Sequence, residues 1–335
     1  MLILPQNYHS SLDMRTTQAA IKYVKDTFQL NLAASLNLQR VSAPLFVRPE
    51  TGLNDNLNGT ERPVSFDAPA AGGKDLEIVH SLAKWKRMTL GRYKFNIGEG
   101  LYTDMNAIRR DEDDLDNIHS MYVDQWDWES VISSEQRTKE TLVDTVKKIY
   151  HVIRTTAAAA SEKYPQLKCE LPEDIAFITS QELFEMYPYM TGKEREYAIT
   201  KSKKAVFIMQ IGKRLSNGEK HDGRAPDYDD WELNGDILVY YPLLDIALEL
   251  SSMGIRVDEN SLVRQCKEAN AEDRLSLEFH QKILNKELPY TIGGGIGQSR
   301  LCMLMLNKAH IGEVQSSVWS YETLEKCAQN NIELI

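Results

Sequence analysis

Acidic and amide side chains alternate with tryptophans along residues 122–129. In an extended chain, alternate side chains point to opposite faces, so one face would carry Gln125, Asp127 and Glu129 and the other only apolar groups. Arg109 precedes this segment at a distance that suits a hairpin, and its planar guanidinium could bind a phosphate through two hydrogen bonds. From periodicity alone, a half-exposed strand with its tryptophans in the core explains the pattern equally well.

Two further carboxylates, Asp236 and Glu249, lie in apolar segments that predict strands. An unpaired charge in such a place would be costly. Magnesium bound together with substrate phosphates would remove that cost, because Mg²⁺ favours one or two carboxylates plus phosphate and water oxygens. An ordinary ion pair with Arg256 is the alternative, and the residues alone favour it slightly.

A glycine-rich turn is predicted at residues 292–297, followed by an apolar helix over 301–306. Glycines let a backbone approach a nucleotide closely, and Arg300 would lie in the first helical turn, where the positive end of the helix attracts phosphate. The GxxxxGK[ST] pattern is absent, so this segment is not a P-loop.

Two charged runs are ambiguous. The basic run at residues 80–87 is typical of a solvated helix face, and the run at 224–231 fits either a surface loop or a site for a cationic substrate. The seven histidines form no HExxH set, and no GxSxG elbow occurs. Hydrolytic and zinc chemistry therefore have no support.

Composition excludes several classes of protein. The chain has 335 residues, 42% of them hydrophobic, and a formal charge of −10, so an extended polyanion such as tRNA would be repelled. No stretch approaches the ~18 uninterrupted apolar residues of a membrane span. The four cysteines lack metal-ligand spacing and are expected to be reduced thiols. We expect a cytoplasmic protein that binds neither nucleic acid nor membrane.

The elements that would position these residues follow from periodicity and turn signals. Apolar residues three and four apart predict amphipathic helices over residues 14–36 and after Ser133 and Ser134. A strand interrupted by Pro44 is expected at 38–47, and a loop at 49–61. Further strands are expected at residues 76–79, 121–123, 175–178, 205–211, 236–241 and 248–252. The alternation is not regular, and no linker marks a boundary, so we expect one α+β domain over 1–335 with a mostly antiparallel sheet flanked by helices.

Taken in order, the segments around Pro44, around Arg109 and at 293–300 resemble the three signature motifs of class II aminoacyl-tRNA synthetases. The resemblance sharpens to the aspartate–ammonia ligases, the ammonia-dependent asparagine synthetases built on that fold. It is carried by DNLNG at 55–59, HSLAKWKR at 80–87, GEGLYT at 98–103, YVDQWDWE at 122–129, RAPDYDDW at 224–231, ELSSMGIRV at 249–257 and TIGGGIGQSR at 291–300.

This resemblance implies ATP-dependent joining of ammonia to aspartate through a β-aspartyl-adenylate, with AMP and pyrophosphate released. Asp236 and Glu249 are then the Mg²⁺ ligands, Arg109 binds the α-phosphate and Arg300 a distal phosphate. The ATP site would include Ser120, Val123, Asp236, Glu249 and Gly295 besides the two arginines. Aspartate and ammonia would be surrounded by Asp55, Lys86, Gln125, Asp127, Asp229, Ser252 and Arg256, with Arg109, Asp55 and Lys86 as the catalytic residues. Pro44 implies a homodimer.

Three alternative functions compete with this one. A glutamine-dependent synthetase needs a nucleophilic cysteine, usually at the exposed N-terminus, and residue 2 is Leu2. A synthetase paralogue that transfers an adenylated amino acid to a protein lysine or to tRNA is the main enzymatic alternative. A catalytically inactive amino-acid sensor should have lost Arg109, Arg300, Asp236 or Glu249, and all four are present.

Overall fold

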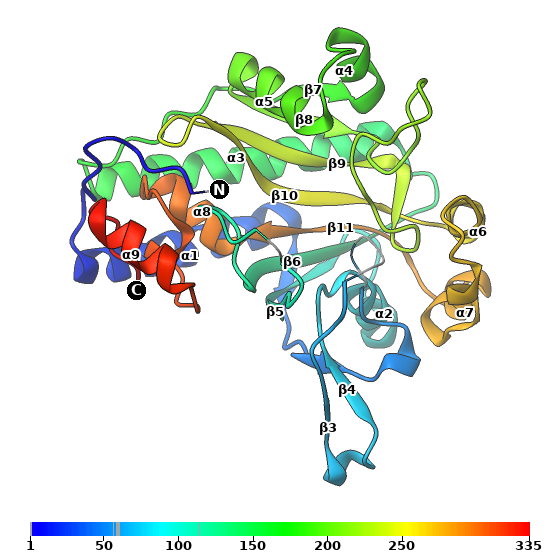
Figure 1. Cartoon of the computed structure of the whole chain (residues 1–335). Coiled ribbons are helices and arrows are strands. Elements are labelled where there is room, and N and C mark those ends of the chain that lie inside the picture. The colour runs from blue at the N-terminus through cyan, green and yellow to red at the C-terminus, as the bar shows by residue number, and fades with distance from the viewer. Residues whose placement is uncertain (1, 56, 58–60, 113) are drawn as a thin grey trace.

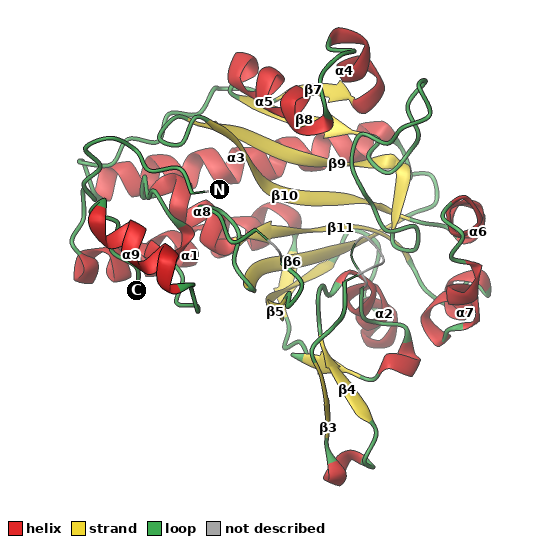
Figure 2. Cartoon of the chain, viewed as in Figure 1, coloured by secondary structure: helices red, strands yellow, loops and turns green. Residues whose placement is uncertain are grey.

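The computed structural model describes residues 2–55, 57, 61–112 and 114–335. A large sheet crosses the molecule with helices on both faces (Figure 1, Figure 2). Its strands, in spatial order, are β1 (Leu38–Arg40), β5 (Gly100–Ile108), β6 (Tyr122–Ile132), β11 (Tyr290–Gly297), β10 (Ile246–Arg256), β9 (Asp229–Tyr241), β8 (Ala205–Met209) and β7 (Ala176–Thr179). Among these residues only the edge pairs β1–β5 and β7–β8 are parallel. The expectation of an α+β fold with a mostly antiparallel sheet is confirmed.

One face of the sheet is covered by α1 (Met14–Leu36), α3 (Lys139–Lys163) and α8 (Gln298–Met305). Helix α1 has the bounds that its periodicity predicts, and Asp13 caps it by accepting a hydrogen bond from the backbone of Thr16. The second long helix is confirmed after Ser133 and Ser134. Helix α3 begins at Lys139, where the Thr138 side chain caps it, several residues after the two serines.

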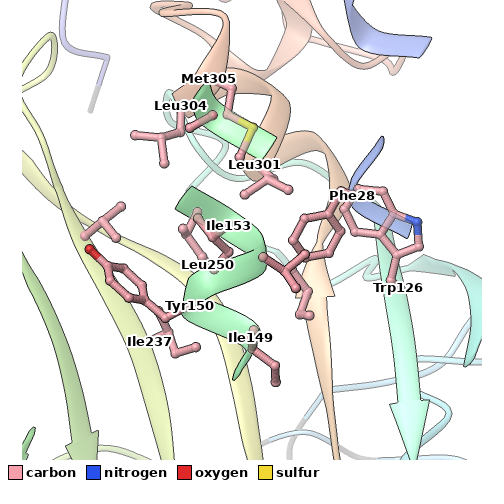
Figure 3. Close-up of a cluster of buried hydrophobic side chains, with 14 of the residues drawn as sticks. Phe28, Trp126, Ile149, Tyr150, Ile153, Ile237, Leu250, Leu301, Leu304 and Met305 are labelled. Carbon is pink, nitrogen blue, oxygen red and sulfur yellow. The ribbon is translucent and has the colours of Figure 1, made fainter. Parts of the chain in front are cut away.

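The tryptophan face of β6 packs into this core (Figure 3). Trp126 and Trp128 are fully buried, and the ring centroids of Phe28 and Trp126 lie 4.6 Å apart. Asp127 and Glu129, on the other face of the same strand, are 2% and 0% exposed. The interpretation of β6 as a half-exposed strand is therefore wrong, because both of its faces are buried.

The opposite face of the sheet is covered by helices only in part. Helix α2 packs on β6 and β11, α5 packs on β9 and β10, and the sheet between them is left to polar side chains. The helices apart from α1, α3 and α8 are α2 (Ala83–Tyr93), α4 (Ser180–Met186), α5 (Gly192–Lys203), α6 (Glu259–Glu268), α7 (Glu278–Leu284) and α9 (Tyr321–Gln329). Of the described residues, no helix is long and apolar enough to cross a membrane.

The segment 38–47 does not form the single interrupted strand that was expected. Its ends are β1 in the large sheet and β2 (Phe46–Val47) in a small one, and Pro44 lies in the irregular connection between them. The small sheet is completed by β4 (Asp75–Ile78) and β3 (Ser65–Asp67), which project from the body of the molecule (Figure 1).

The other strand predictions are confirmed in place; β6, β9 and β10 are longer than expected, whereas β8 ends at Met209, before the predicted residue 211. Strand β9 starts at Asp229 and β10 ends at Arg256, so both extend beyond their apolar centres into charged residues. Strand β5 was not predicted as an element. It forms the hairpin with β6 that the position of Arg109 suggested, and Arg109 directly follows its last residue.

Candidate active site

The polar face of the sheet is the floor of a cavity of about 390 Å³. One row of cross-strand neighbours runs along this floor, from Asp127 on β6 through Gly295 on β11 and Ser252 on β10 to Asp236 on β9. Every residue that was predicted to bind substrate, ATP or metal lines the cavity. These residues are Asp55, Lys86, Arg109, Ser120, Val123, Gln125, Asp127, Asp229, Asp236, Glu249, Ser252, Arg256, Gly295 and Arg300.

The glycine-rich segment lies within strand β11, so the turn predicted there is wrong. A Cβ on Gly293 would stand 1.9 Å from Glu129 Oε2, and one on Gly295 would stand 2.3 Å from Gln125 Oε1. These glycines therefore make room for the polar side chains of the neighbouring strand β6 to lie across the floor. The position predicted for Arg300 is confirmed, because it is the third residue of α8.

Strand β10 brings Glu249 and Ser252 to the same cavity although they are three residues apart. In a regular strand that spacing would put them on opposite faces. A register shift between Glu249 and Ser251 inserts an extra residue, and Leu250 turns into the apolar core (Figure 3). The bulge is what allows a possible metal ligand and a possible substrate ligand to share one face.

Arg256 is bound by two buried carboxylates. Its Nε and Nη2 donate to Glu129 at 2.9 and 2.7 Å, and its Nη1 donates to Asp229. Burial alone would raise the pKa of Glu129, but Arg256 and Lys86 hold that pKa below its usual value. Burial would likewise lower the pKa of Arg256, and the two carboxylates raise it instead. Arg256 and Glu129 are therefore both charged at neutral pH.

Helix α2 directs its basic side chains inward, so the prediction of a solvated basic face is wrong. Lys84, Lys86 and Arg87 are 4%, 1% and 2% exposed. Lys86 Nζ donates to the carbonyl of Gly294 at 2.8 Å and lies 3.1 Å from Asp127 Oδ2. Burial lowers the pKa of Lys86, and Asp127 opposes that shift.

Asp55 stands at the edge of the cavity beside a second buried ion pair. Lys84 Nζ donates to the carbonyl of Asn54 at 3.0 Å and pairs with Asp227 at 2.7 Å, which fixes the segment that carries Asp55. Asp55 Oδ2 is buried and has no hydrogen-bond partner among the described residues. Burial raises the pKa of Asp55. The rest of the DNLNG segment lies largely outside the described residues.

Asp236 is paired, but its partner is Arg224, whereas Arg256 was expected. Arg224 Nη2 lies 2.6 Å from Asp236 Oδ1, and Arg224 Nη1 donates to Ser252 Oγ. Burial raises the pKa of Asp236 to about 7; Arg224 opposes this rise and Glu249 adds to it. Because the two carboxylates repel each other, a divalent cation between them would stabilise both.

The two arginines at the other end of the cavity, Arg109 and Arg300, form hydrogen bonds with backbone carbonyls. The backbone N of Arg109 donates to the Met121 carbonyl at 2.8 Å, and its buried Nε has no hydrogen-bond partner in the described part of the chain. Arg300 donates to the carbonyls of Ile118 and Glu249 at 3.3 and 3.1 Å. Both guanidiniums can therefore accept a phosphate without first giving up a carboxylate partner shown among the described residues.

The donor set fits magnesium bound through ATP better than a metal bound by protein alone. No cluster of three or more His, Cys, Asp or Glu that could hold a metal occurs within the described ranges. Asp236 and Glu249 would supply two oxygens, and phosphates and water the others, which is the arrangement that Mg²⁺ prefers.

Among the cavity residues that sequence reasoning missed, Arg224 and Tyr228 make the most informative contacts. Arg224 and Tyr228 lie in the run 224–231, and the charges of that run do not indicate whether its side chains point to solvent or into a site. The Arg256 guanidinium lies 5.8 Å from the centre of the Tyr228 ring, and burial raises the pKa of that tyrosine well above its usual value. Only the fold reveals these contacts, because the segment has no regular period before β9 begins.

The sequence is similar to those of known aspartate–ammonia ligases. The family model described as aspartate-ammonia ligase matches residues 15–331. An aspartate–ammonia ligase of Ruminiclostridium cellulolyticum is 65% identical over 100% of this chain and 99% of its own length. One of Fusobacterium nucleatum is 64% identical over 98% of this chain and 99% of its own length.

Among solved structures, asparaginyl-tRNA synthetases share the fold at low sequence identity. The Pyrococcus horikoshii enzyme complexed with asparaginyl-adenylate matches with a TM-score of 0.64 at 14% identity, covering 90% of this chain and 68% of that protein. The Entamoeba histolytica enzyme with asparaginyl-adenylate gives 0.63 at 13%, covering 90% and 66%, so the chain spans about two thirds of these synthetases. The class II synthetase-like fold is thereby confirmed. Because the family model and these close relatives match it almost from end to end, the chain belongs to the aspartate–ammonia ligase family.

Proposed function

We propose that this chain makes L-asparagine from L-aspartate and ammonia with ATP, through a β-aspartyl-adenylate, releasing AMP and pyrophosphate. One observation carries the proposal. A single cavity joins a pocket of paired acids and bases to a region with two arginines and two carboxylates, and the floor row from Asp127 to Asp236 connects them. The first region, which we name the amino-acid half, suits a zwitterion. The second, the phosphate half, suits ATP with a divalent cation.

In the amino-acid half, Asp127 and Asp229 receive the ammonium group of aspartate, and Asp55 receives ammonia. Buried ion pairs of Lys86 with Asp127 and of Arg256 with Asp229 fix those two acids in place. Preorganised charges of this kind need little rearrangement when substrate binds. Gln125 and Ser252 add neutral donors on the same floor.

In the phosphate half, Arg109 stabilises charge on the α-phosphate and Arg300 binds a distal phosphate. Ser120, Val123 and Gly295 line the space for the nucleotide between them. Asp236 and Glu249 would hold Mg²⁺. The cation would offset phosphate charge and support the departure of pyrophosphate, as in other phosphoryl-type transfers.

The reaction has two steps in this geometry. The β-carboxylate of aspartate attacks the α-phosphorus, which forms the mixed anhydride and releases pyrophosphate. Ammonia then attacks the acyl carbon and AMP leaves. Asp55, a buried carboxylate with a raised pKa and a free Oδ2 among the described contacts, takes up a proton as ammonium becomes ammonia.

A cytoplasmic homodimer completes the proposal. Exposed apolar side chains near Pro44 support an interface, because Leu45 and Phe46 are 47% and 45% exposed and Leu30 on α1 is 65% exposed. A dimer would cover part of this surface. Light scattering at micromolar concentration should give twice the chain mass, and a fully active monomer would contradict this part of the proposal.

The test is an assay without tRNA that contains ATP, Mg²⁺, aspartate and ammonium. Asparagine, AMP and pyrophosphate should form in equal amounts, and omission of ammonium should stop AMP release after adenylate formation. Formation of an aminoacylated tRNA or an aspartyl-lysine adduct instead would favour the synthetase paralogue that transfers an amino acid to tRNA or protein.

A further inference from the structure

Both cations at the centre of the amino-acid half are already committed to acids. Arg256 donates through its Nε and both terminal nitrogens to Glu129 and Asp229. Lys86 pairs with Asp127 and donates to a backbone carbonyl. Three carboxylates therefore face two cations, an excess of negative charge that suits an ammonium group. A substrate with two carboxylates needs a further cation in this half.

Arg224 is placed to supply that cation. Its side chain is 8% exposed, and the loop between β8 and β9 that carries it contributes residues 222–225 to the cavity lining. Two of its nitrogens bind Asp236 and Ser252, and its Nε is buried with no hydrogen bond to any described residue. Asp229 Oδ2 lies 3.7 Å from that Nε, too far for a hydrogen bond. One N–H of this buried, cavity-lining guanidinium thus has no hydrogen-bond partner among the described residues.

The guanidinium spans the boundary between the two halves. It contacts Asp236, which belongs to the phosphate half, and its unused Nε lies near Asp229, which belongs to the amino-acid half. At this boundary the nucleophilic carboxylate must approach the α-phosphate, although both are anionic. A fixed cation there lowers their repulsion, and the planar fork of arginine can orient a carboxylate as a lysine cannot.

We propose that Arg224 binds the reacting β-carboxylate of aspartate and thereby selects a dicarboxylate as the substrate. The inference rests on the proposed function and adds a residue to which the sequence analysis gave no role. Serine and carboxylate partners keep the guanidinium in place before substrate arrives. The reacting carboxylate of aspartate then binds the guanidinium where Arg224 lines the cavity, and its other carboxylate and its ammonium group remain with the rest of the amino-acid half.

Binding calorimetry with substrate and product tests this assignment. Asparagine keeps the ammonium and α-carboxylate of aspartate but carries a neutral amide where the reacting carboxylate was. Arg224→Gln should weaken aspartate binding at least about tenfold and leave asparagine binding within about twofold. Arg224→Lys keeps the charge without the fork and should fall between the wild type and Arg224→Gln. Thermal unfolding of each variant shows whether the fold is retained.

Arg214→Gln is the matched control, because Arg214 lies on the same loop but is exposed and outside the cavity lining. It should bind both ligands as the wild type does. Equal weakening of aspartate and asparagine by Arg224→Gln would place the contact on the α-carboxylate and overturn the inference. Unchanged binding of both would overturn it too. A wild-type protein that makes no asparagine would instead refute the proposed function.

Discussion

The two halves of the cavity differ in how their charged side chains are paired. In the amino-acid half, Arg256, Glu129 and Asp229 satisfy one another and are buried. In the phosphate half, the Arg300 guanidinium donates to two backbone carbonyls, the backbone N of Arg109 donates to a third, and neither guanidinium forms an ion pair with a carboxylate in the described part of the chain. A closed ionic network gives a fixed shape that can discriminate between substrates. The unpaired guanidiniums of the phosphate half can instead bind the phosphates of the substrate. Substitutions in the amino-acid half should therefore lower the stability of the fold, and substitutions in the phosphate half should lower the reaction rate.

The largest expected effect is on stability, from Glu129→Gln. The substitution leaves Arg256 buried with half of its partners lost, and breaking a buried pair in this way costs about 3–5 kcal/mol. Urea denaturation should show a correspondingly lower free energy of unfolding. An unchanged unfolding midpoint would mean that the network in the amino-acid half does not support the fold.

Arg109→Lys should leave stability nearly unchanged and reduce the rate. Loss of one fixed donor to the transition state typically costs about 10²- to 10³-fold, roughly 3–4 kcal/mol, and a lysine cannot replace the planar fork. Aspartate-dependent pyrophosphate exchange and asparagine synthesis should fall together. Normal exchange at saturating ATP, with only a raised Michaelis constant, would make Arg109 a ground-state binding residue.

Glu249→Gln should raise the Mg²⁺ concentration needed for half-maximal activity by roughly 10- to 100-fold, as is typical even for outer partners of a metal site. The free energy of unfolding should stay the same or rise, since the substitution removes the repulsion that Glu249 exerts on Asp236. Titration of activity with Mg²⁺ and urea denaturation of the metal-free protein measure the two effects. Lost stability with an unchanged Mg²⁺ requirement would mean that Glu249 is a structural residue.

The pH dependence of stability should carry a smaller signature of Asp236. Its pKa rises from 3.8 to about 7 in the folded protein, so the folded state holds a proton that the unfolded state releases. The resulting stability is present below pH 3.8 and is lost as pH rises through about 7. Comparison of Asp236→Asn with the wild type across this range should show a change of at least about 1 kcal/mol. Parallel curves would mean that Arg224 keeps Asp236 ionised throughout.

The sequence predicts the parts of the fold and site in which the spacing of apolar and polar side chains alone decides which face is buried. The alternation at Gln125, Asp127 and Glu129 gives the correct polar face, and the apolar stripe of α1 gives its correct bounds. Features that depend on contacts between distant segments could not be predicted. Nothing local indicates that the basic run of α2 turns inward, since its partners are carboxylates on other elements.

The same limit explains the errors in the candidate site. The bulge that aligns Glu249 with Ser252 has no local sequence signal, because it depends on the register with β9. The pairing of Asp236 with Arg224 depends on how the loop before β9 folds back over the floor. The glycines of β11 looked like a turn, and only the side chains lying across them explain why glycine is required in that strand.

The most direct test of the two-half account is to follow oxygen from aspartate that is labelled with ¹⁸O in its β-carboxylate. If that carboxylate attacks the α-phosphorus where the halves meet, one labelled oxygen must stay on phosphorus when ammonia attacks the acyl carbon. Mass spectrometry should then find one ¹⁸O in AMP, one in asparagine and none in pyrophosphate. Unlabelled AMP, or label in pyrophosphate or inorganic phosphate, would contradict an aspartyl-adenylate formed in this cavity.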